Sequence, residues 1–180
     1  MTIGRWGVVA ILTGLASASI AAEPEEMRYD CDTTPGHFSQ FAMPQAPGRQ
    51  SLSGVITAQA LYRGGQWQPT AHVRLVSADG DSWVGVRLTA KAQTKAVVQK
   101  GAVVRVEIAY RTGKKAVVAD EVGMIPLGQG LPYALTVAGE QVRVRVGESE
   151  QVVPLALGDQ RKVMLACSTG DFLFTAMPAH

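Results

Sequence analysis

Residues 166–170, with the sequence ACSTG, are the first place to look for catalytic chemistry, because their spacing matches a small-x-Ser-x-Gly nucleophile elbow. An elbow needs a strand before the serine, a helix after it, and an acid and a histidine later in the chain. Residues 171–177 instead alternate like a strand, and only His180 lies further downstream. The pattern therefore predicts a final hairpin with its turn at Thr169-Gly170, and Ser168 is not expected to be catalytic.

Metal-binding patterns are equally sparse. The histidines His37, His72 and His180 lie far apart, and the cysteines have no CxxC spacing. Residues 79–82, with the sequence DGDS, resemble a fragment of a calcium loop but lack its later acidic ligands. We expect a β-turn there, no bound metal and no cofactor.

Paired carboxylates could in principle cut a glycosidic bond, if one were protonated and the other ionised across a cleft. Glu148 and Glu150 follow a glycine in an expected hairpin turn, where charged side chains are usually solvated. Asp120 and Glu121 are adjacent and would point to opposite faces of a strand. Neither pair predicts a general acid and base, so we assign no catalytic residue.

Tryptophan and arginine residues favour binding over catalysis. Trp67 and Trp83 offer flat apolar faces to sugar rings, and arginines can grip carboxylates or phosphates with two hydrogen bonds. Alternation with a period of two directs several of these side chains toward water. The competing interpretation is an ordinary solvated sheet face, whose arginines discourage pairing between edges. The candidate ligand-binding residues are Trp67, His72, Arg74, Trp83, Arg87, Arg105, Arg143 and Arg145.

The first 22 residues have the features of a secretory signal peptide. A basic start at Arg5 precedes an apolar run from Trp6 to Leu15, and small residues follow until the composition changes at Glu23. The apolar run is shorter than the roughly 20 residues that a transmembrane helix needs. We expect cleavage after Ala21 or Ala22, a periplasmic or secreted protein, and no transmembrane segment.

The remaining chain, about 158 residues, is long enough for one domain with a sizeable core. Removing Arg5 from the 17 basic residues leaves 16 against 15 acidic residues, so the charge predicts no nucleic-acid partner. In an oxidising compartment, Cys31 and Cys167 favour a disulfide, for which the chain allows one pairing. Two separate buried thiols are the alternative. A bridge would make the first and last strands neighbours.

Apolar alternation with a period of two predicts an all-β protein. Apart from a weak helical pattern at residues 90–99, no window favours a helix. Turn residues separate the strands, as in a single antiparallel β-sandwich of the jelly-roll type. The expected strands are Leu52–Tyr62, Ala71–Ser77, Trp83–Ala90, Val103–Tyr110, Tyr133–Val137, Val142–Val146, Gln151–Leu155, Val163–Ser168 and Phe172–Met177.

The beginning of the expected domain, residues 23–180, lacks this regularity. Between Thr33 and Gln50 the chain has three prolines and two glycines, which interrupt extended pairing. We therefore expect an irregular segment over residues 23–50, with a short strand near Cys31.

The segment LPYALTVAGEQVRVRVGESEQVVPLALGDQRKVMLACSTGDFLFTAM resembles the closing part of concanavalin A-like jelly rolls of the lectin and glucanase type. PTAHVRLVSADGDSWVGVRL is similar to their middle strands. The resemblance implies a two-sheet sandwich with a concave face that often binds carbohydrate. The ExDxxE motif of the glucanases is absent, as are the arginine-, histidine- and tyrosine-bearing motifs of alginate-lyase-type jelly rolls, so the resemblance implies binding without catalysis.

These patterns lead to three hypotheses of function. The first is an exported, non-catalytic β-sandwich that binds a glycan, for example an anionic one, or a cell-envelope partner through an outer sheet face. The second is a polysaccharide lyase or glycosidase, which requires a Tyr, His or carboxylate with a perturbed pKa in a cleft. The third is a structural envelope protein, which requires an apolar surface patch. An exposed Trp67 or Trp83 would favour the first hypothesis.

Overall fold

The structure is a computed structural model that describes residues 27–45, 48–62, 64, 66–90 and 101–177. The expected signal peptide and residues 91–99 of the weak helical pattern lie outside these ranges. Within them, no helix is long and apolar enough to cross a membrane. The strands are β1 (Met27–Pro44), β2 (Ser51–Leu61), β3 (Thr70–Ser77), β4 (Trp83–Ala90), β5 (Val103–Arg111), β6 (Val118–Pro126), β7 (Gly130–Ala138), β8 (Gln141–Val146), β9 (Ser149–Pro154) and β10 (Arg161–Met177).

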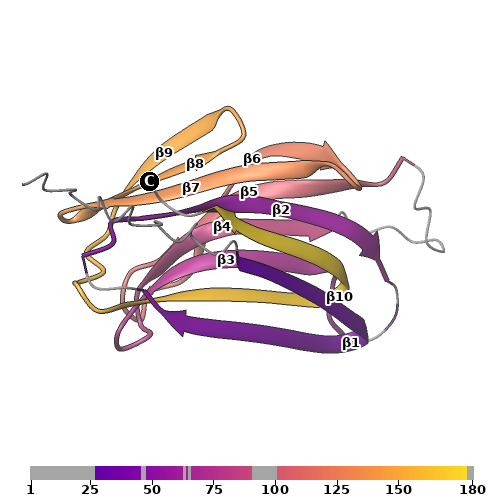
Figure 1. The fold of residues 1–180 in the computed structure, drawn as a ribbon, viewed down its shortest axis with the longest axis horizontal. Helices are drawn as coiled ribbons and strands as arrows, with labels where there is room; N and C mark the ends of the chain where they lie inside the picture. Colours follow the sequence, from indigo (N-terminus) through magenta and orange to yellow (C-terminus); the bar gives the residue numbers. More distant parts are fainter. Residues whose placement is uncertain (1–26, 46–47, 63, 65, 91–100, 178–180) are drawn as a thin grey trace, which may run out of the picture.

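The antiparallel strands follow the order β6-β5-β4-β3-β10-β2-β7-β8-β9, with β1 beside β10 (Figure 1). Strand β10 belongs to two layers, because Arg161–Ser168 pairs with β3 whereas Gly170–Met177 pairs with β2. Strand β1 accompanies β10 through this change. We call β3, β4, β5 and β6 layer A, and β2, β7, β8 and β9 layer B. The halves of β1 and β10 complete the two layers, which gives the expected all-β sandwich.

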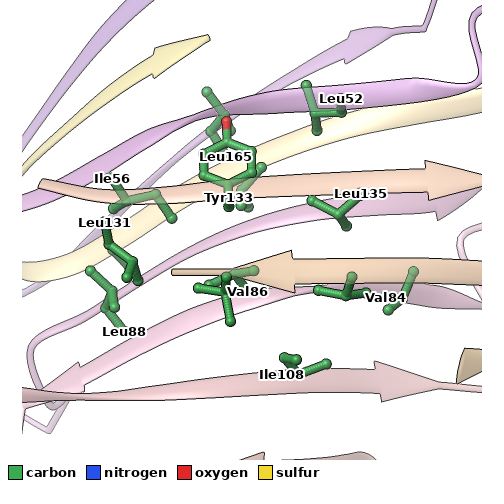
Figure 2. Close-up of a cluster of buried hydrophobic side chains, with 14 of the residues drawn as sticks. Leu52, Ile56, Val84, Val86, Leu88, Ile108, Leu131, Tyr133, Leu135 and Leu165 are labelled. Atoms are coloured by element: carbon green, nitrogen blue, oxygen red, sulfur yellow. The ribbon is translucent and has the colours of Figure 1, made fainter. Parts of the chain in front are cut away.

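Apolar residues at alternate positions of both layers form one core. Val84 and Val86 of β4 belong to the same buried cluster as Leu131 and Leu135 of β7, with Leu165 of β10 (Figure 2). Full burial of such a side chain contributes about 1.5–3 kcal/mol. The predicted alternation therefore places one face of each central strand in the core and leaves the other face outside.

Over residues 27–44, strand β1 corrects the expectation of an irregular segment at residues 23–50. It extends over Met27–Pro44 and pairs with β10 on both sides of a register shift between Thr33 and Phe38. The Pro35-Gly36 pair lies inside this shift, and Gly36 has a φ of 79°. Proline and glycine therefore mark one bend in a long strand, and pairing with β10 keeps the rest extended.

Strand β10 corrects the expected final hairpin. Thr169 and Gly170 lie within one strand, so the chain bends there instead of reversing. Thr169 has a φ of 51° and is the only non-glycine residue of the described ranges with a positive φ. A Cβ at Gly170 would lie 2.7 Å from the Phe172 ring and 2.8 Å from the Ala60 carbonyl oxygen. The residues that resemble a nucleophile elbow therefore carry β10 from layer A to layer B.

Strand β6 is absent from the sequence prediction because its sequence, VADEVGMIP, lacks regular alternation. Its pairing with β5 contains a register shift between Val106 and Glu107. Side-chain contacts also join β6 to β9, the strands at the two ends of the strand order. Gln151 Nε2 donates to Asp120 Oδ2 at 2.9 Å, and Ser149 Oγ donates to the Val122 carbonyl at 3.4 Å.

A disulfide joins Cys31 and Cys167, whose Cα atoms are 6.1 Å apart, and confirms the predicted pairing. In the strand register Cys31 lies opposite Phe172 and Cys167 lies opposite Ser39, so the bridge crosses the shared bend of β1 and β10. Both cysteines are buried in the core. The first and last strands are neighbours, as the sequence predicted.

Candidate functional site

The side of layer A that faces away from the core carries four rows of side chains, because directly paired residues of antiparallel strands share a face. We call this surface the outer face. One row joins Gln40, Ala166, His72, Arg87, Glu107 and Glu121; the next joins Ala42, Met164, Arg74, Gly85 and Ala109. The flanking rows are Phe38, Ser168, Thr70, Thr89 and Arg105 on one side, and Lys162, Val76, Trp83 and Arg111 on the other.

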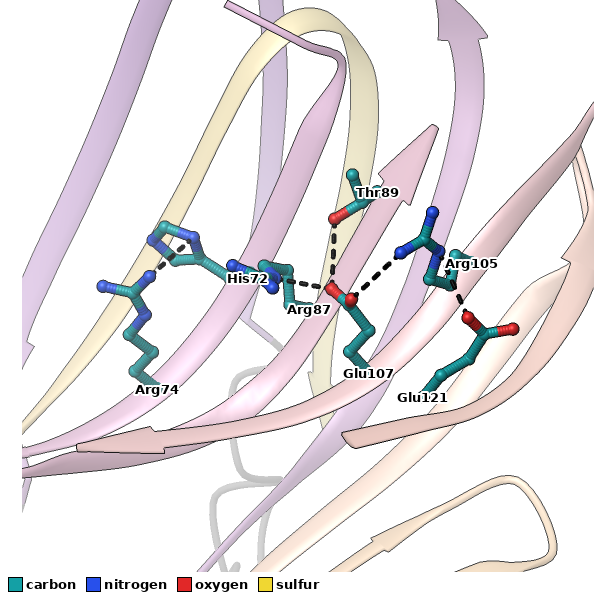
Figure 3. A network of polar contacts seen from close by, with 7 residues as sticks. All are labelled: His72, Arg74, Arg87, Thr89, Arg105, Glu107 and Glu121. Carbon is teal, nitrogen blue, oxygen red and sulfur yellow. Dashed lines mark hydrogen bonds and ion pairs between the residues drawn. The ribbon is translucent and has the colours of Figure 1, made fainter. Parts of the chain in front are cut away.

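Glu107 lies between Arg87 and Arg105 in the polar network of this face (Figure 3). Its side chain is 8% exposed and accepts a hydrogen bond from Arg87 Nε at 2.6 Å. Arg105 lies 3.6 Å from the other carboxylate oxygen and 3.4 Å from Glu121, and the Thr89 hydroxyl donates to Glu107 at 3.4 Å. Charge-assisted hydrogen bonds of this kind are strong and orient both partners. The charges of Arg87 and Arg105 are therefore already balanced within the protein.

Arg74 differs from these two arginines, because it makes no ion pair with a carboxylate of the described residues. Its guanidinium carbon lies 3.9 Å from the centre of the Trp83 ring, in a cation–π contact. Its Nη2 donates to His72 Nδ1 at 3.3 Å, and its buried Nε has no hydrogen-bond partner in the described structure. Burial, followed by the charges of Arg87 and Arg111, lowers its pKa to about 10. Arg74 thus remains a cation at neutral pH and has unused donor capacity.

His72 lies beside Arg74 and opposite Arg87 in the strand register. Burial, followed by the charges of these two arginines, lowers the pKa of His72 to about 3. The imidazole is therefore neutral at neutral pH. Because Nδ1 accepts from Arg74, this hydrogen-bond arrangement assigns the proton to Nε2.

Arg111 fixes the turn between β3 and β4. Its Nε donates to the Asp81 carbonyl and its Nη2 to the Gly80 carbonyl, both at 2.8 Å. Asp79 accepts hydrogen bonds from Ser77 Oγ at 2.5 Å and from the Asp81 amide at 2.9 Å. The DGDS sequence therefore forms the expected turn. In the part of the chain that the structure describes, no cluster of three or more His, Cys, Asp or Glu residues could hold a metal ion.

Trp83 lies on the predicted face but is not the expected exposed platform. Only 6% of it is exposed, because Arg74 covers its ring and Val76, Ala109 and Met164 pack with it. Alternation gave the correct side of β4. It could not indicate that a side chain of the neighbouring strand lies across the indole.

The other candidate binding residues lie in three places. His72, Arg74, Arg87 and Arg105 gather on the outer face with Trp83, whereas Trp67 is 51% exposed in the segment before β3. The remaining two arginines project from β8 in layer B, on the side opposite its buried valines. These two are Arg143, which lies 3.4 Å from Glu150, and Arg145. The structure therefore does not place them on the outer face.

Several residues of this surface were not among the sequence candidates, and four of them bear on binding. Glu107 and Arg111 have the same parity as Arg105, but strand order is needed to show that they lie beside Arg87 and Trp83. Lys162 ends up two strands from Trp83, in the same row. Phe38 was missed because it falls in the segment expected to be irregular.

Comparison with solved structures identifies the class of fold. The alginate lyase from Alteromonas sp. 272 has 8% sequence identity and a TM-score of 0.53, over 71% of this chain and 69% of its own. The polysaccharide lyase family 18 protein aly-SJ02 r-CATD has 9% identity and a TM-score of 0.51, over 85% and 70%. Caenorhabditis elegans galectin LEC-6 has 12% identity and a TM-score of 0.48, over 85% and 96%.

These similarities concern the fold alone. The chain has a jelly-roll β-sandwich that resembles the concanavalin A-like superfamily, as the sequence predicted. No protein-family model and no curated protein matches the sequence.

Proposed function

We propose that the protein is an exported, non-catalytic β-sandwich that binds an anionic glycan through the outer face of layer A. The observation that carries this proposal is Arg74, a cation that lies on Trp83 with an unpartnered Nε and without a carboxylate partner among the described residues. Arginine can present two parallel N–H donors to a carboxylate or sulfate. Because Nε is buried, an anionic group on a sugar would approach the guanidinium through its terminal nitrogens and balance its charge.

The distribution of charge around Arg74 supports an anionic ligand. Arg111 donates to backbone carbonyls, and neither it nor Lys162 forms an ion pair in the described ranges. Arg74 therefore lies in a row adjacent to two further uncompensated cations, while Glu107 neutralises the charges on its other side. The anionic group would bind toward Arg111 and Lys162 and away from Glu107.

Two observations support a polysaccharide and an exported protein. The two structures reported above with TM-scores over 0.5 are named as lyases, one an alginate lyase and the other a polysaccharide lyase. The disulfide fits an oxidising compartment, and the amino-terminal sequence has the pattern of a signal peptide. We therefore propose a periplasmic or secreted location, with a polysaccharide or another cell-envelope component as the partner.

A polysaccharide lyase is the second candidate, and His72 is the observation that favours it. Nδ1 accepts from Arg74 in the observed arrangement, so His72 would take a proton from a sugar carbon only after Arg74 turned to the adjacent carboxylate and released Nδ1. Elimination would then break the C–O bond to the next sugar, which leaves an unsaturated sugar on one fragment and a hydroxyl group, protonated from water, on the other. Ultraviolet absorbance of polyuronates incubated with the protein tests this candidate, and no increase is expected for a binding protein.

Calorimetric titration with polyuronates and sulfated polysaccharides tests the proposed function. Arg74→Gln removes the charge and should weaken binding about ten- to a hundredfold, since hydrogen bonds to charged groups contribute about 1.5–3 kcal/mol. Arg143→Gln is the matched control and should bind like the parent, because Arg143 lies on layer B. Circular dichroism would establish that both variants are folded. Absence of binding to every acidic polysaccharide, or unchanged binding by Arg74→Gln, would overturn the proposal.

A further inference from the structure

Two large aromatic side chains lie exposed at one end of the outer face. Phe38 is 59% exposed and Trp67 is 51% exposed. Phe38 pairs with Ser168 in the strand register, and Ser168 Oγ donates to the Gln68 carbonyl at 2.7 Å. This hydrogen bond brings the segment that contains Trp67 close to Ser168, where the half of β10 that belongs to layer A ends and where Phe38 also lies. Phe38 and the residue next to Trp67 therefore both lie beside Ser168, although Phe38 and Trp67 are 29 positions apart in the sequence.

This aromatic end lies well away from Arg74. Phe38 and Thr70 belong to one row, and Thr70 precedes Arg74 by four residues on β3. At about 3.3 Å per residue, the rows are about 13 Å apart along the strands. Two strand spacings, about 10 Å in total, separate β1 from β3 across the sheet. A single sugar cannot reach both places, whereas an extended oligosaccharide can.

Polar side chains occupy the surface between these two places. The row that separates them contains Gln40, His72 and Arg87, which offer hydrogen-bonding groups at positions between Phe38 and Arg74. His72 is neutral and presents an N–H donor, and the charge of Arg87 is balanced by Glu107. Hydroxyl groups of a sugar suit such an uncharged, hydrogen-bonding surface better than a second strong anion does.

We propose that Phe38 and Trp67 form an aromatic subsite that stacks on the apolar face of a sugar, within the same acidic polysaccharide chain whose anionic group binds Arg74. The inference rests on the proposed function and extends it to the length of the ligand. An aromatic ring buries the C–H face of a sugar while the sugar hydroxyls remain solvated. The protein thus recognises an internal stretch of a long acidic glycan, in contrast to a terminal sugar.

Oligosaccharides of increasing length separate this subsite from the anion site. We would titrate the full chain, after removal of any signal peptide, with polyuronate fragments from the disaccharide upward. Affinity should rise steeply until the fragment spans both places and then level off. Phe38→Ala and Trp67→Ala should weaken binding of long fragments about five- to tenfold and leave disaccharide binding unchanged. Arg74→Gln should weaken binding of both.

Phe41→Ala is the matched control, because Phe41 is exposed on the same strand but has the opposite parity. It should bind every fragment like the parent. Equal affinity for short and long fragments, or unchanged binding by both Phe38→Ala and Trp67→Ala, would overturn the subsite and leave the anion site intact. Absence of any polyuronate binding would overturn the proposed function together with the subsite. Weakening by Phe41→Ala equal to that by Phe38→Ala would indicate a general apolar contact and would also refute the subsite.

Discussion

Tyr133 should destabilise the protein through its hydroxyl group. The residue is 3% exposed in the core, and its hydroxyl oxygen has no hydrogen-bond partner in the described structure. Figure 2 shows the ring among aliphatic side chains that include Leu165. Burial of an unsatisfied polar group costs about 1–3 kcal/mol. Because Tyr133→Phe removes that group and keeps the ring, it should increase the free energy of unfolding by about 1–2 kcal/mol.

Thermal unfolding followed by circular dichroism measures this change. For a domain of this size, a gain of 1–2 kcal/mol raises Tm by about 2–8 °C. Tyr29→Phe is the matched control, since the Tyr29 hydroxyl and Ser39 Oγ are 2.8 Å apart and hydrogen-bonded. Loss of this hydrogen bond in Tyr29→Phe should lower the free energy of unfolding by about 0.5–1.5 kcal/mol. The two variants should therefore shift Tm in opposite directions.

The pH dependence of stability gives a second test of Tyr133. Burial raises its pKa above the usual 10.0, so the folded state resists ionisation of this phenol. Below pH 10 the Tyr133 phenol is neutral in both the folded and the unfolded chain. As pH rises above 10 the phenol ionises first in the unfolded chain, so the free energy of unfolding decreases until pH reaches the pKa of the folded state. Tyr133→Phe should therefore gain additional stability over the parent above pH 10. A less stable variant, or one with the parental alkaline dependence, would refute the argument and indicate a hydrogen-bonded hydroxyl.

Three further changes test the fold and the site. Replacement of Cys31 and Cys167 by Ser should cost up to about 5 kcal/mol in the chain-entropy model, measured by urea unfolding, while the native protein should gain two protons in mass on reduction. Gly170→Ala should cost more than about 2 kcal/mol because its Cβ overlaps neighbouring atoms, whereas Gly123→Ala, with open space, should change stability by less than about 0.5 kcal/mol. The pKa of His72 is lowered to about 3 by burial and neighbouring arginines, so its contribution to stability is complete above pH 6.5 and lost between pH 6.5 and 3. His72→Gln should therefore lose less stability than the parent over this range, and equal losses would contradict the assignment.

Local alternation explains why the central strands could be predicted. On β4, Val84 and Val86 point to the core while Arg87 points outward, and this order follows from the two-residue period of a strand. The two-residue period indicates which face of the sheet each side chain lies on, but it does not indicate which strand lies next to it. The ion pair between Arg87 and Glu107 and the contact between Arg74 and Trp83 depend on strand order, so the sequence alone could not indicate them.

The bend shared by β1 and β10 could not be predicted from local sequence patterns, for a different reason. Thr169-Gly170 and Pro35-Gly36 have the composition of turns, and an isolated segment with such residues would be expected to reverse. Here each strand pairs with the other on both sides of the bend, and this pairing keeps them extended. The disulfide could be predicted because the chain has two cysteines, which allow one pairing within it.

The disulfide also determines how the domain would respond to mechanical force. Met27 and Ala176 are paired at the same end of β1 and β10, so a pull that separates the chain ends would open these strands like a zipper, a few hydrogen bonds at a time. Opening along β1 would stop at Cys31, where the covalent bond to Cys167 would carry the load. The residues between the two cysteines, which are 136 positions apart, would remain outside the path of the force. The anion site, whose residues all lie between the two cysteines, would therefore stay folded, whereas the part of β10 that pairs with β2 would be peeled away from layer B.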